Sequence, residues 1–324
     1  MTDTKALMRH QYTLDRKPRP YLLQPALLGV DKEKQLYYQQ RLARLNWAAA
    51  ILHIGSGIAI AWLILDSSPW QVFATVKHVL WQPVNATDAG QSCADVPCKI
   101  TVEEVVVGEL YLEWIVLQFH VTSGLHHLVV AWICPDLYHS YLDNKMQPFR
   151  WIDYALSAST MQVVILVLCG FTDVWTLTLG AVAIATTQIF GHVIEQVLFL
   201  GFDKLRCWSW IETWQYYLYG WVPFVTPWVA VYWSFYDSIG RANPGPPEWV
   251  KAIVWTLLAA FSCFAFNMAY YVWNYCDPFI SYKAEVIYAW LSLIAKAALA
   301  WQLYYGAYGR SDRELTAWRP PNDL

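Results

Sequence analysis

The chain has 324 residues, of which 57% are hydrophobic and only 15% charged, and it contains 20 tryptophans and 21 tyrosines. This composition excludes a disordered chain and differs from that of a water-soluble globular protein. The formal net charge of −3 is small, so it indicates neither a nucleic-acid partner nor an acidic substrate. We therefore expect a membrane protein that crosses the lipid bilayer several times.

The predicted elements begin with a polar N-terminal tail, residues 1–45, whose prolines at 18 and 20 interrupt any early helix. Residues 31–44 can form a charged helix that runs into the membrane. The tail has no apolar core of signal-peptide type, so the first spanning segment is expected to act as an uncleaved signal. Seven apolar segments long enough to span the bilayer follow, at 46–66, 109–134, 151–170, 176–200, 209–236, 249–275 and 281–309. The fold class is thus an all-α membrane protein: a seven-helix bundle at 46–309, followed by a C-terminal tail at 310–324.

The first connection, residues 67–108, is too long for a simple turn and contains the β-branched run 99–107, which predicts a small β-structure. It also holds Cys93, Cys98 and the sequon Asn85-Ala-Thr87. A disulfide and a glycosylated asparagine both suit the oxidising, extracellular side of a membrane. Two free thiols and a chance sequon remain an alternative. The other five cysteines show no metal-ligand spacing.

The Lys and Arg residues predict the orientation. With the N-terminus inside, 14 of the 22 fall on the cytoplasmic side and 7 outside, and the remaining one is Lys296. This excess favours a cytoplasmic N-terminus and an extracellular C-terminus in the cell membrane.

Lys296 is a lone cation near the middle of the last apolar segment, 15 residues after Ser281 and 12 before Tyr308. A charge at the bilayer centre costs about 3 kcal/mol or more, so such a lysine faces the bundle interior and is paired, neutralised or chemically modified. A lysine amine in a dry pocket is also the group that forms a Schiff base with an aldehyde. The alternative is a lysine that snorkels to the interface, which suits helix ends better than a central position.

Three other titratable groups are predicted at a similar depth, in the cytoplasmic half of the membrane. Helical rise places His53 about two turns from the start of the first segment and His126 about two turns from the end of the second. Arg150 and Asp153 share a face of the third segment, and Asp153 needs a cation, for which Lys296 is the nearest candidate in depth. For each histidine taken singly, a packing role is the simpler interpretation, but their convergence with a carboxylate indicates function.

Two runs carry a resemblance to a known family: Arg150-Trp-Ile-Asp-Tyr-Ala-Leu-Ser-Ala-Ser-Thr-Met161 and Leu291-Ser-Leu-Ile-Ala-Lys-Ala-Ala-Leu-Ala-Trp-Gln302. Together with Phe190-Gly191, Glu195, Pro227-Trp228 and Phe266-Asn267, they resemble the heliorhodopsins over about residues 44 to 306. The resemblance implies a seven-helix photoreceptor with an inverted topology, a homodimer, and all-trans retinal as cofactor.

The resemblance also implies roles for individual residues. Lys296 would carry retinal as a protonated Schiff base, and Asp153 would be its counterion. His53 and His126, with Arg150, would belong to a polar cavity on the cytoplasmic side. Positions in or near the retinal pocket would be Ser157, Met161, Trp228, Asn267 and Ser292.

The chain departs from the family pattern at three positions, where Asp153 replaces a usual Glu, Ile184 a usual Asn and His192 a usual Trp. These changes concern the colour of the chromophore and not the class of protein. The carboxylates expected of an outward proton pump are also missing, because Ser292 and Val164 occupy their positions. A photosensor with an unknown cytoplasmic signalling partner is therefore expected.

Two other functions stay open. Glu113, His120 and His127 recur every seventh residue on the second segment, so they lie on one helical stripe that could relay protons in light. The simpler interpretation places Glu113 at the membrane interface and gives the histidines packing roles. The second alternative is a seven-helix transporter or scaffold without retinal, in which Lys296 and Asp153 pair structurally. No nucleophile–base pair or phosphate loop suggests an enzyme.

Overall fold

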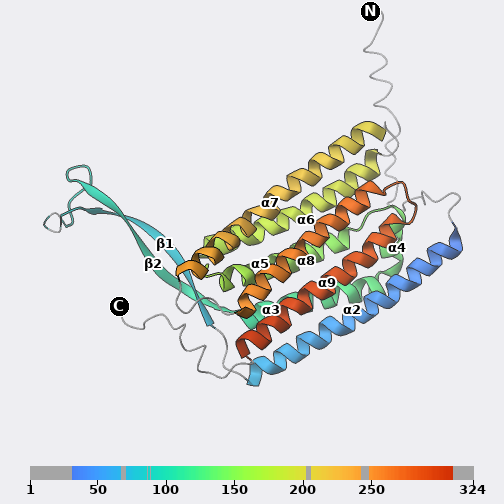
Figure 1. The fold of residues 1–324 in the computed structure, drawn as a ribbon, viewed down its shortest axis with the longest axis horizontal. Helices are drawn as coiled ribbons and strands as arrows, with labels where there is room; N and C mark the ends of the chain where they lie inside the picture. Colours follow the sequence, from blue (N-terminus) through green and yellow to red (C-terminus); the bar gives the residue numbers. More distant parts are fainter. Residues whose placement is uncertain are drawn as a thin grey trace, which may run out of the picture.

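The computed structural model describes residues 31–66, 71–85, 87, 89–201, 206–241 and 248–308. Within them, seven long helices pack into one bundle, and a two-stranded ribbon projects from one of its ends (Figure 1). The predicted fold class, a helical membrane bundle with a small β-structure, is confirmed. Most of the predicted N-terminal tail and all of residues 310–324 lie outside the described residues.

The elements follow the chain in a simple order. They are α2 (Lys32–Asp66), β1 (Gln71–Pro83), β2 (Cys98–Tyr111), α3 (Leu112–Leu128) with a π-helical turn (Val129–Ile133), α4 (Pro135–Asp143), α5 (Pro148–Leu168), α6 (Val174–Gly201), α7 (Arg206–Arg241), α8 (Glu248–Trp273) and α9 (Ile280–Leu303) with a second π-helical turn (Tyr304–Tyr308).

The helices form a ring in which α2 packs against α3 and α9, α3 against α5, α5 against α6, and α6 against α7, while α8 packs on α9. The bundle has two distinguishable ends (Figure 1). We call the end that carries β1 and β2 the hairpin end, and the opposite end, where the short helix α4 lies, the α4 end.

The ribbon is an antiparallel hairpin in which Gln71 pairs with Tyr111 and Pro83 with Cys98. Its base is fixed to the α5–α6 connection, because the Thr75 backbone N–H donates to the Thr172 carbonyl at 2.9 Å. At its far end a disulfide joins Cys93 and Cys98, and Asn85 is exposed nearby.

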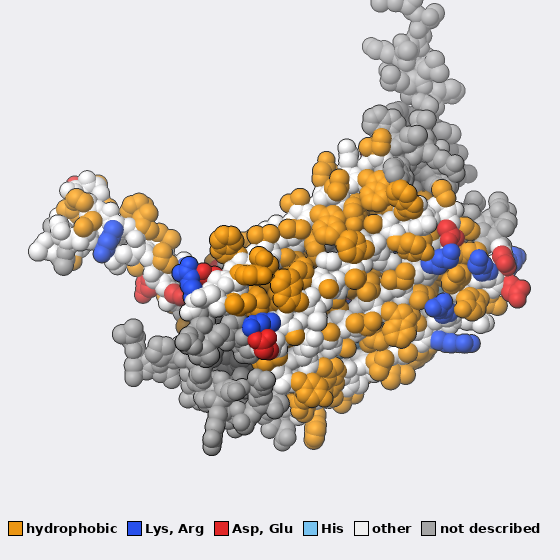
Figure 2. All heavy atoms as spheres, viewed as in Figure 1, with side chains coloured by type: hydrophobic (Ala, Val, Ile, Leu, Met, Phe, Trp, Pro, Cys, Tyr) orange, Lys and Arg blue, Asp and Glu red, His pale blue; other side chains and the backbone are white. Residues whose placement is uncertain are grey.

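Apolar side chains cover the outside of the bundle between its two ends (Figure 2). They include large residues that would be costly to expose to water, such as Trp62, Leu179, Val222, Trp233 and Trp273. Five of the described helices, α2, α5, α6, α8 and α9, are long and apolar enough to cross a membrane. Helix α3 has 17 residues, short of a full span, before its π-helical turn extends it.

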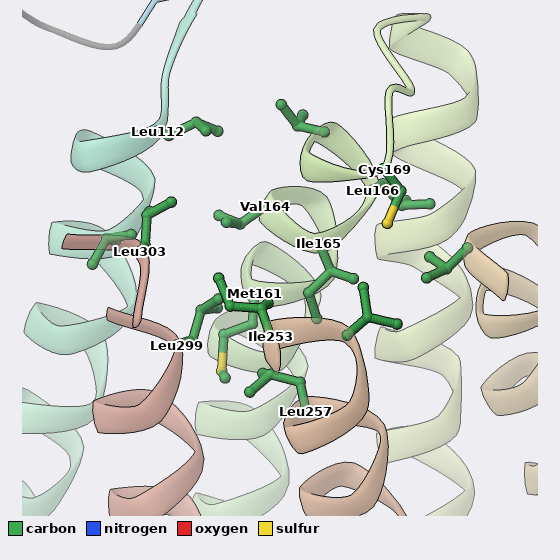
Figure 3. Packing of buried hydrophobic residues seen from close by; sticks show 14 of the residues in the cluster. Leu112, Met161, Val164, Ile165, Leu166, Cys169, Ile253, Leu257, Leu299 and Leu303 are labelled. Atoms are coloured by element: carbon green, nitrogen blue, oxygen red, sulfur yellow. The ribbon is translucent and has the colours of Figure 1, made fainter. Parts of the chain in front are cut away.

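The interior differs between the two halves. Near the hairpin end, α3, α5, α8 and α9 contribute a dry core that includes Leu112, Val164, Ile165, Ile253 and Leu303 (Figure 3). Among the described residues, the buried charged groups other than Glu113 lie elsewhere, around Lys296 and toward the α4 end.

Helix α2 begins at Lys32, so the charged stretch and the first apolar segment form one continuous helix of 35 residues. This agrees with the expected charged helix that runs into the membrane. Helix α4 was not predicted because it is too short and polar to resemble a spanning segment; it begins at Pro135 and buries Tyr138 and Leu142.

Candidate functional site

The centre of the site is a buried ion pair between α9 and α5. The Lys296 ammonium lies 3.2 Å from Asp153 Oδ2 and donates to Ser292 Oγ at 2.7 Å. Asp153 also accepts a hydrogen bond of 2.8 Å from Ser123 on α3. Both charged side chains are almost fully buried, so the pair depends on these partners for its stability.

An apolar pocket opens beside the ammonium of Lys296, between α5, α6, α7, α8 and α9. The empty space within the pocket and its open mouth is about 820 Å³. Aromatic side chains dominate its wall: Trp151, Tyr154, Phe190, Tyr217, Trp221, Phe224, Phe261, Phe264 and Tyr288. This is the lining expected of a small-molecule site, with one reactive amine at its end.

Several predicted pocket positions do line this space: Ser157, Met161, Ser292 and Ile184. Two others do not. Trp228 packs edge-on against Phe261 and so lies behind the wall, while the Asn267 amide donates to the Ala284 carbonyl on α9. His192 is also absent from the wall and pairs with Gln196 on α6. The prediction missed Trp221, which follows Tyr217 by one helical turn and shares its face.

Three histidines gather next to the ion pair: His53, from the predicted polar cavity, and His120 and His127, from the predicted stripe of the second segment. His53 Nδ1 lies 3.1 Å from His120 Nδ1, and the His53 ring stacks on His127 with centroids 5.6 Å apart. All three are buried. His126, which was predicted with His53 in the polar cavity, has its ring 5.1 Å from the ring of His127, measured between centroids.

A second ionic cluster lies between the site and the α4 end. Arg150 pairs with both Glu195 on α6 and Glu285 on α9. Glu195 also accepts from the Gln147 backbone N–H and from the Trp151 indole N–H, each at 2.8 Å. Arg150 was predicted in the polar cavity, but Glu285 was not predicted. Glu285 could have been found from its position eleven residues before Lys296, which is three helical turns away on the same side of α9.

Two polar side chains connect this cluster with the histidines. Tyr138 on α4 donates to Glu285 Oε1 at 3.1 Å, and the Asn46 amide nitrogen donates to the Tyr138 oxygen at 3.3 Å. Asn46 Oδ1 lies 2.8 Å from His127 Nδ1. Buried polar groups therefore form a continuous series from Arg150 to the histidines.

On the hairpin-end side of the histidines, Glu113 is buried in the first turn of α3. The described part of the chain contains no group of three or more His, Cys, Asp or Glu side chains arranged to hold a metal ion.

The arrangement can bind an elongated apolar aldehyde. The pocket supplies apolar and aromatic contacts along its length, and Lys296 supplies the amine for a covalent linkage. Asp153 would balance a positive charge retained on the linked nitrogen.

Comparisons with known proteins give one family match and several similar folds. The family model described as Heliorhodopsin matches residues 42–308. Among solved structures, the light-driven proton pump LR (Mac) from Leptosphaeria maculans is similar with a TM-score of 0.52 and 12% identity, covering 82% of this chain and 96% of that one. The transmembrane domain of Salpingoeca rosetta rhodopsin phosphodiesterase is similar with a TM-score of 0.51 and 9% identity, covering 83% and 86%. These two likenesses concern the fold alone. No curated protein matches the chain.

Proposed function

The chain belongs to the heliorhodopsin family, and from this premise we propose that it is a photoreceptor that carries all-trans retinal on Lys296, with Asp153 as the counterion. The family indicates a retinal light-sensing protein that crosses the membrane several times. The observation that supports the residue assignment is the buried Lys296–Asp153 pair at the end of an aromatic pocket. When bound, retinal supplies the absorption of visible light and a change of shape on isomerisation.

Side chains of the protein set the charge and the geometry around the Lys296 nitrogen. Asp153 provides the negative charge, and Ser123 fixes the orientation of its carboxylate. Ser292 accepts from Lys296 one turn away on the same helix. The aromatic wall excludes water, which strengthens the interaction between the two charges.

We propose a sensor and not a standard proton pump, because the two pump carboxylates are replaced by Ser292 and Val164. Val164 belongs to the dry core. A proton has no carboxylate there through which it could cross. The signal would then pass to a partner at the α4 end, and we expect neither enzymatic activity nor a nucleic-acid partner.

The proposed setting is the cell membrane, with the N-terminus and the α4 end cytoplasmic and the hairpin end and C-terminus extracellular. The chain is proposed to function as a homodimer in the bilayer. In this orientation the Cys93–Cys98 disulfide and Asn85 face the oxidising side.

The first test is the visible absorption spectrum of the full chain after addition of all-trans retinal, beside Lys296→Ala. The wild type should show a visible band that the variant lacks. Asp153→Asn should lose most of the band at neutral pH and regain it on acidification, because a neutral amide no longer balances the positive nitrogen. No band in wild type would overturn the proposal and favour a transporter or scaffold with a structural Lys296–Asp153 pair.

A second candidate function is proton transport in light, favoured by one observation: His120 and His127 both contact His53 and lie on the same stripe of α3 as Glu113. Photocurrents in voltage-clamped cells test it. Currents present in wild type and reduced in His120→Ala and Glu113→Gln support transport. Absent currents, or currents unchanged in both variants, exclude it.

A further inference from the structure

A series of hydrogen bonds links Arg150 to His127. In each bond, the chemistry of the two groups decides which one donates and which one accepts. The bonds run through four side chains from four elements: Glu285 on α9, Tyr138 on α4, Asn46 on α2 and His127 on α3. Asn46, His127 and Glu285 are almost fully buried, and so is Tyr138. Water therefore does not compete for these bonds.

The assignment of donors and acceptors begins at Glu285. Its second oxygen is paired with the Arg150 guanidinium, which favours the ionised carboxylate, and an ionised carboxylate only accepts hydrogen bonds. The Tyr138 hydroxyl, 3.1 Å from Glu285 Oε1, must therefore donate its one hydrogen to Glu285. The Tyr138 oxygen is left to act as an acceptor.

The assignment continues with Asn46. Because the Tyr138 hydrogen is already used, the Asn46 atom 3.3 Å from it must be the donating NH₂ group. This fixes which way the amide points, a choice that geometry alone often leaves open. The Asn46 carbonyl oxygen then faces His127 Nδ1 at 2.8 Å and can only accept.

His127 must consequently carry its hydrogen on Nδ1. A neutral imidazole has one N–H and one bare nitrogen, so Nε2 of His127 holds a lone pair. Within the described residues this Nε2 is buried and has no hydrogen-bond partner. A ring nitrogen that carries no hydrogen can accept a proton.

We propose that Glu285, Tyr138 and Asn46 are positioning residues that hold His127 in the Nδ1–H tautomer and keep its Nε2 as a proton acceptor for the Lys296–Asp153 pair. The inference rests on the proposed function. His127 follows Ser123 by four residues, one turn of α3, and Ser123 holds Asp153. A proton leaving that pair would come to rest on His127 Nε2, which would make the ring a cation stacked on His53.

The tautomer can be read directly from the ¹⁵N chemical shifts of the full chain labelled only at histidine, in lipid nanodiscs in the dark. His127→Gln assigns the signals. Wild type should show His127 protonated at Nδ1 and bare at Nε2. Tyr138→Phe frees the Asn46 amide to rotate, and Asn46→Leu removes the acceptor, so each should shift the tautomer ratio toward Nε2–H by about fivefold, the effect of one hydrogen bond.

Two further variants separate this role from a general packing effect. Tyr282→Phe removes an equally buried hydroxyl that donates to Asp143 at 2.6 Å and has no link to His127, so it should leave the ratio unchanged. Adding Asn46→Asp to Tyr138→Phe should restore Nδ1–H, because a carboxylate accepts without help from residue 138.

A flash experiment tests the acceptor role. With retinal bound, the loss of the visible band after a flash should be about fivefold slower in Tyr138→Phe and unchanged in Tyr282→Phe. Wild-type His127 protonated at Nε2, or a ratio unaffected by Tyr138→Phe and Asn46→Leu, overturns the inference. The nitrogen shifts decide it even in a protein without a visible band, an outcome that would instead overturn the proposed function.

Discussion

At the scale of single residues, a few buried charged side chains have a large effect on the stability of the interior. Arg150 is shared by two carboxylates, and Lys296 is paired with one. Removing one member of a buried pair leaves an uncompensated charge, which costs about 3–5 kcal/mol, whereas an exposed pair contributes at most about 1 kcal/mol. Location therefore determines what each ion pair contributes to stability.

Arg150→Gln should lower the free energy of unfolding by about 3–5 kcal/mol, because Glu195 and Glu285 would be left buried without a cation. Arg241→Gln is the matched control, since Arg241 pairs with Asp237 in an exposed position and should change stability by no more than about 1 kcal/mol. Thermal unfolding of both variants in the same detergent measures the difference. Equal melting temperatures would show that the Arg150 cluster does not stabilise the fold.

The residues of the site were only partly predictable from the sequence. The depth of a residue in the membrane can be predicted by counting residues along the helix, and this predicted that Lys296 and Asp153 lie at a similar depth. The direction of a side chain around the helix axis does not follow from depth, so the contacts of His53 with His120 and His127 were not predicted. Contacts such as Tyr138 with Glu285, separated by 147 residues, depend on packing that no local pattern encodes.

At the scale of elements, close helix contacts depend on residues without side chains. A Cβ added at Gly191 on α6 would overlap the Trp151 ring on α5. Spanning segments were predictable because length and apolarity define them. Helix α4 was not, because its position depends on Tyr138 and Leu142 packing against the bundle.

Gly191→Ala should destabilise the protein by about 1–3 kcal/mol, since the α5–α6 contact must open to admit the methyl group. Gly55→Ala is its control, because a Cβ there meets nothing within 4 Å and alanine favours the interior of α2 by about 0.5–1 kcal/mol. Melting temperatures should thus move in opposite directions. A shift of the same sign in both variants would contradict the packing argument.

The stability of the start of α6 should depend on pH, because Asp173 caps this helix. Asp173 accepts from the Thr176 backbone N–H at 2.9 Å and so caps the helix. This hydrogen bond lowers the pKa of the Asp173 carboxyl below its usual range. The stabilisation is therefore present above the unfolded-state pKa of about 3.9 and is lost as the pH falls through the lowered value.

Asp173→Ala should cost about 1 kcal/mol at neutral pH, and the difference from wild type should shrink on acidification. Asp173→Asn retains a capping oxygen without a titrating group, so its stability should lie close to that of wild type at neutral pH and vary less with pH. Unfolding curves between pH 3 and 7, at about one-unit steps, measure this. A pH-independent difference between Ala and wild type would show that the cap does not titrate.

At the scale of the whole molecule, the two ends differ in chemistry. The hairpin end carries the disulfide and the dry core, and the α4 end carries the Arg150 cluster. The excess of Lys and Arg predicts that the α4 end is cytoplasmic. The fold class could be predicted because composition fixes it. The course of the hairpin could not, because the exposed strands are positioned by a few contacts of Thr75 and Glu104 with the α5–α6 connection.

Epitope tags fused to the two termini test the orientation. In intact cells an antibody should label the C-terminal tag and reach the N-terminal tag only after permeabilisation. A soluble fusion protein expressed in the same cells controls for membrane integrity. Labelling of the N-terminal tag in intact cells would reverse the assignment of both ends, and with it the side on which a signalling partner should be sought.

The junction between β2 and α3 has a mechanical consequence. Tyr111 ends the strand and Leu112 begins the helix with no residue between them, so the strand passes directly into the helix. The 14 residues of β2 span about 46 Å at about 3.3 Å each. A tilt of α3 by about 5° would therefore swing the outer end of the ribbon by about 4 Å, and the ribbon would act as a lever that magnifies small movements beside Asp153. Distances between spin labels at the ribbon tip and on α7, measured in darkness and in light, would show whether the lever moves.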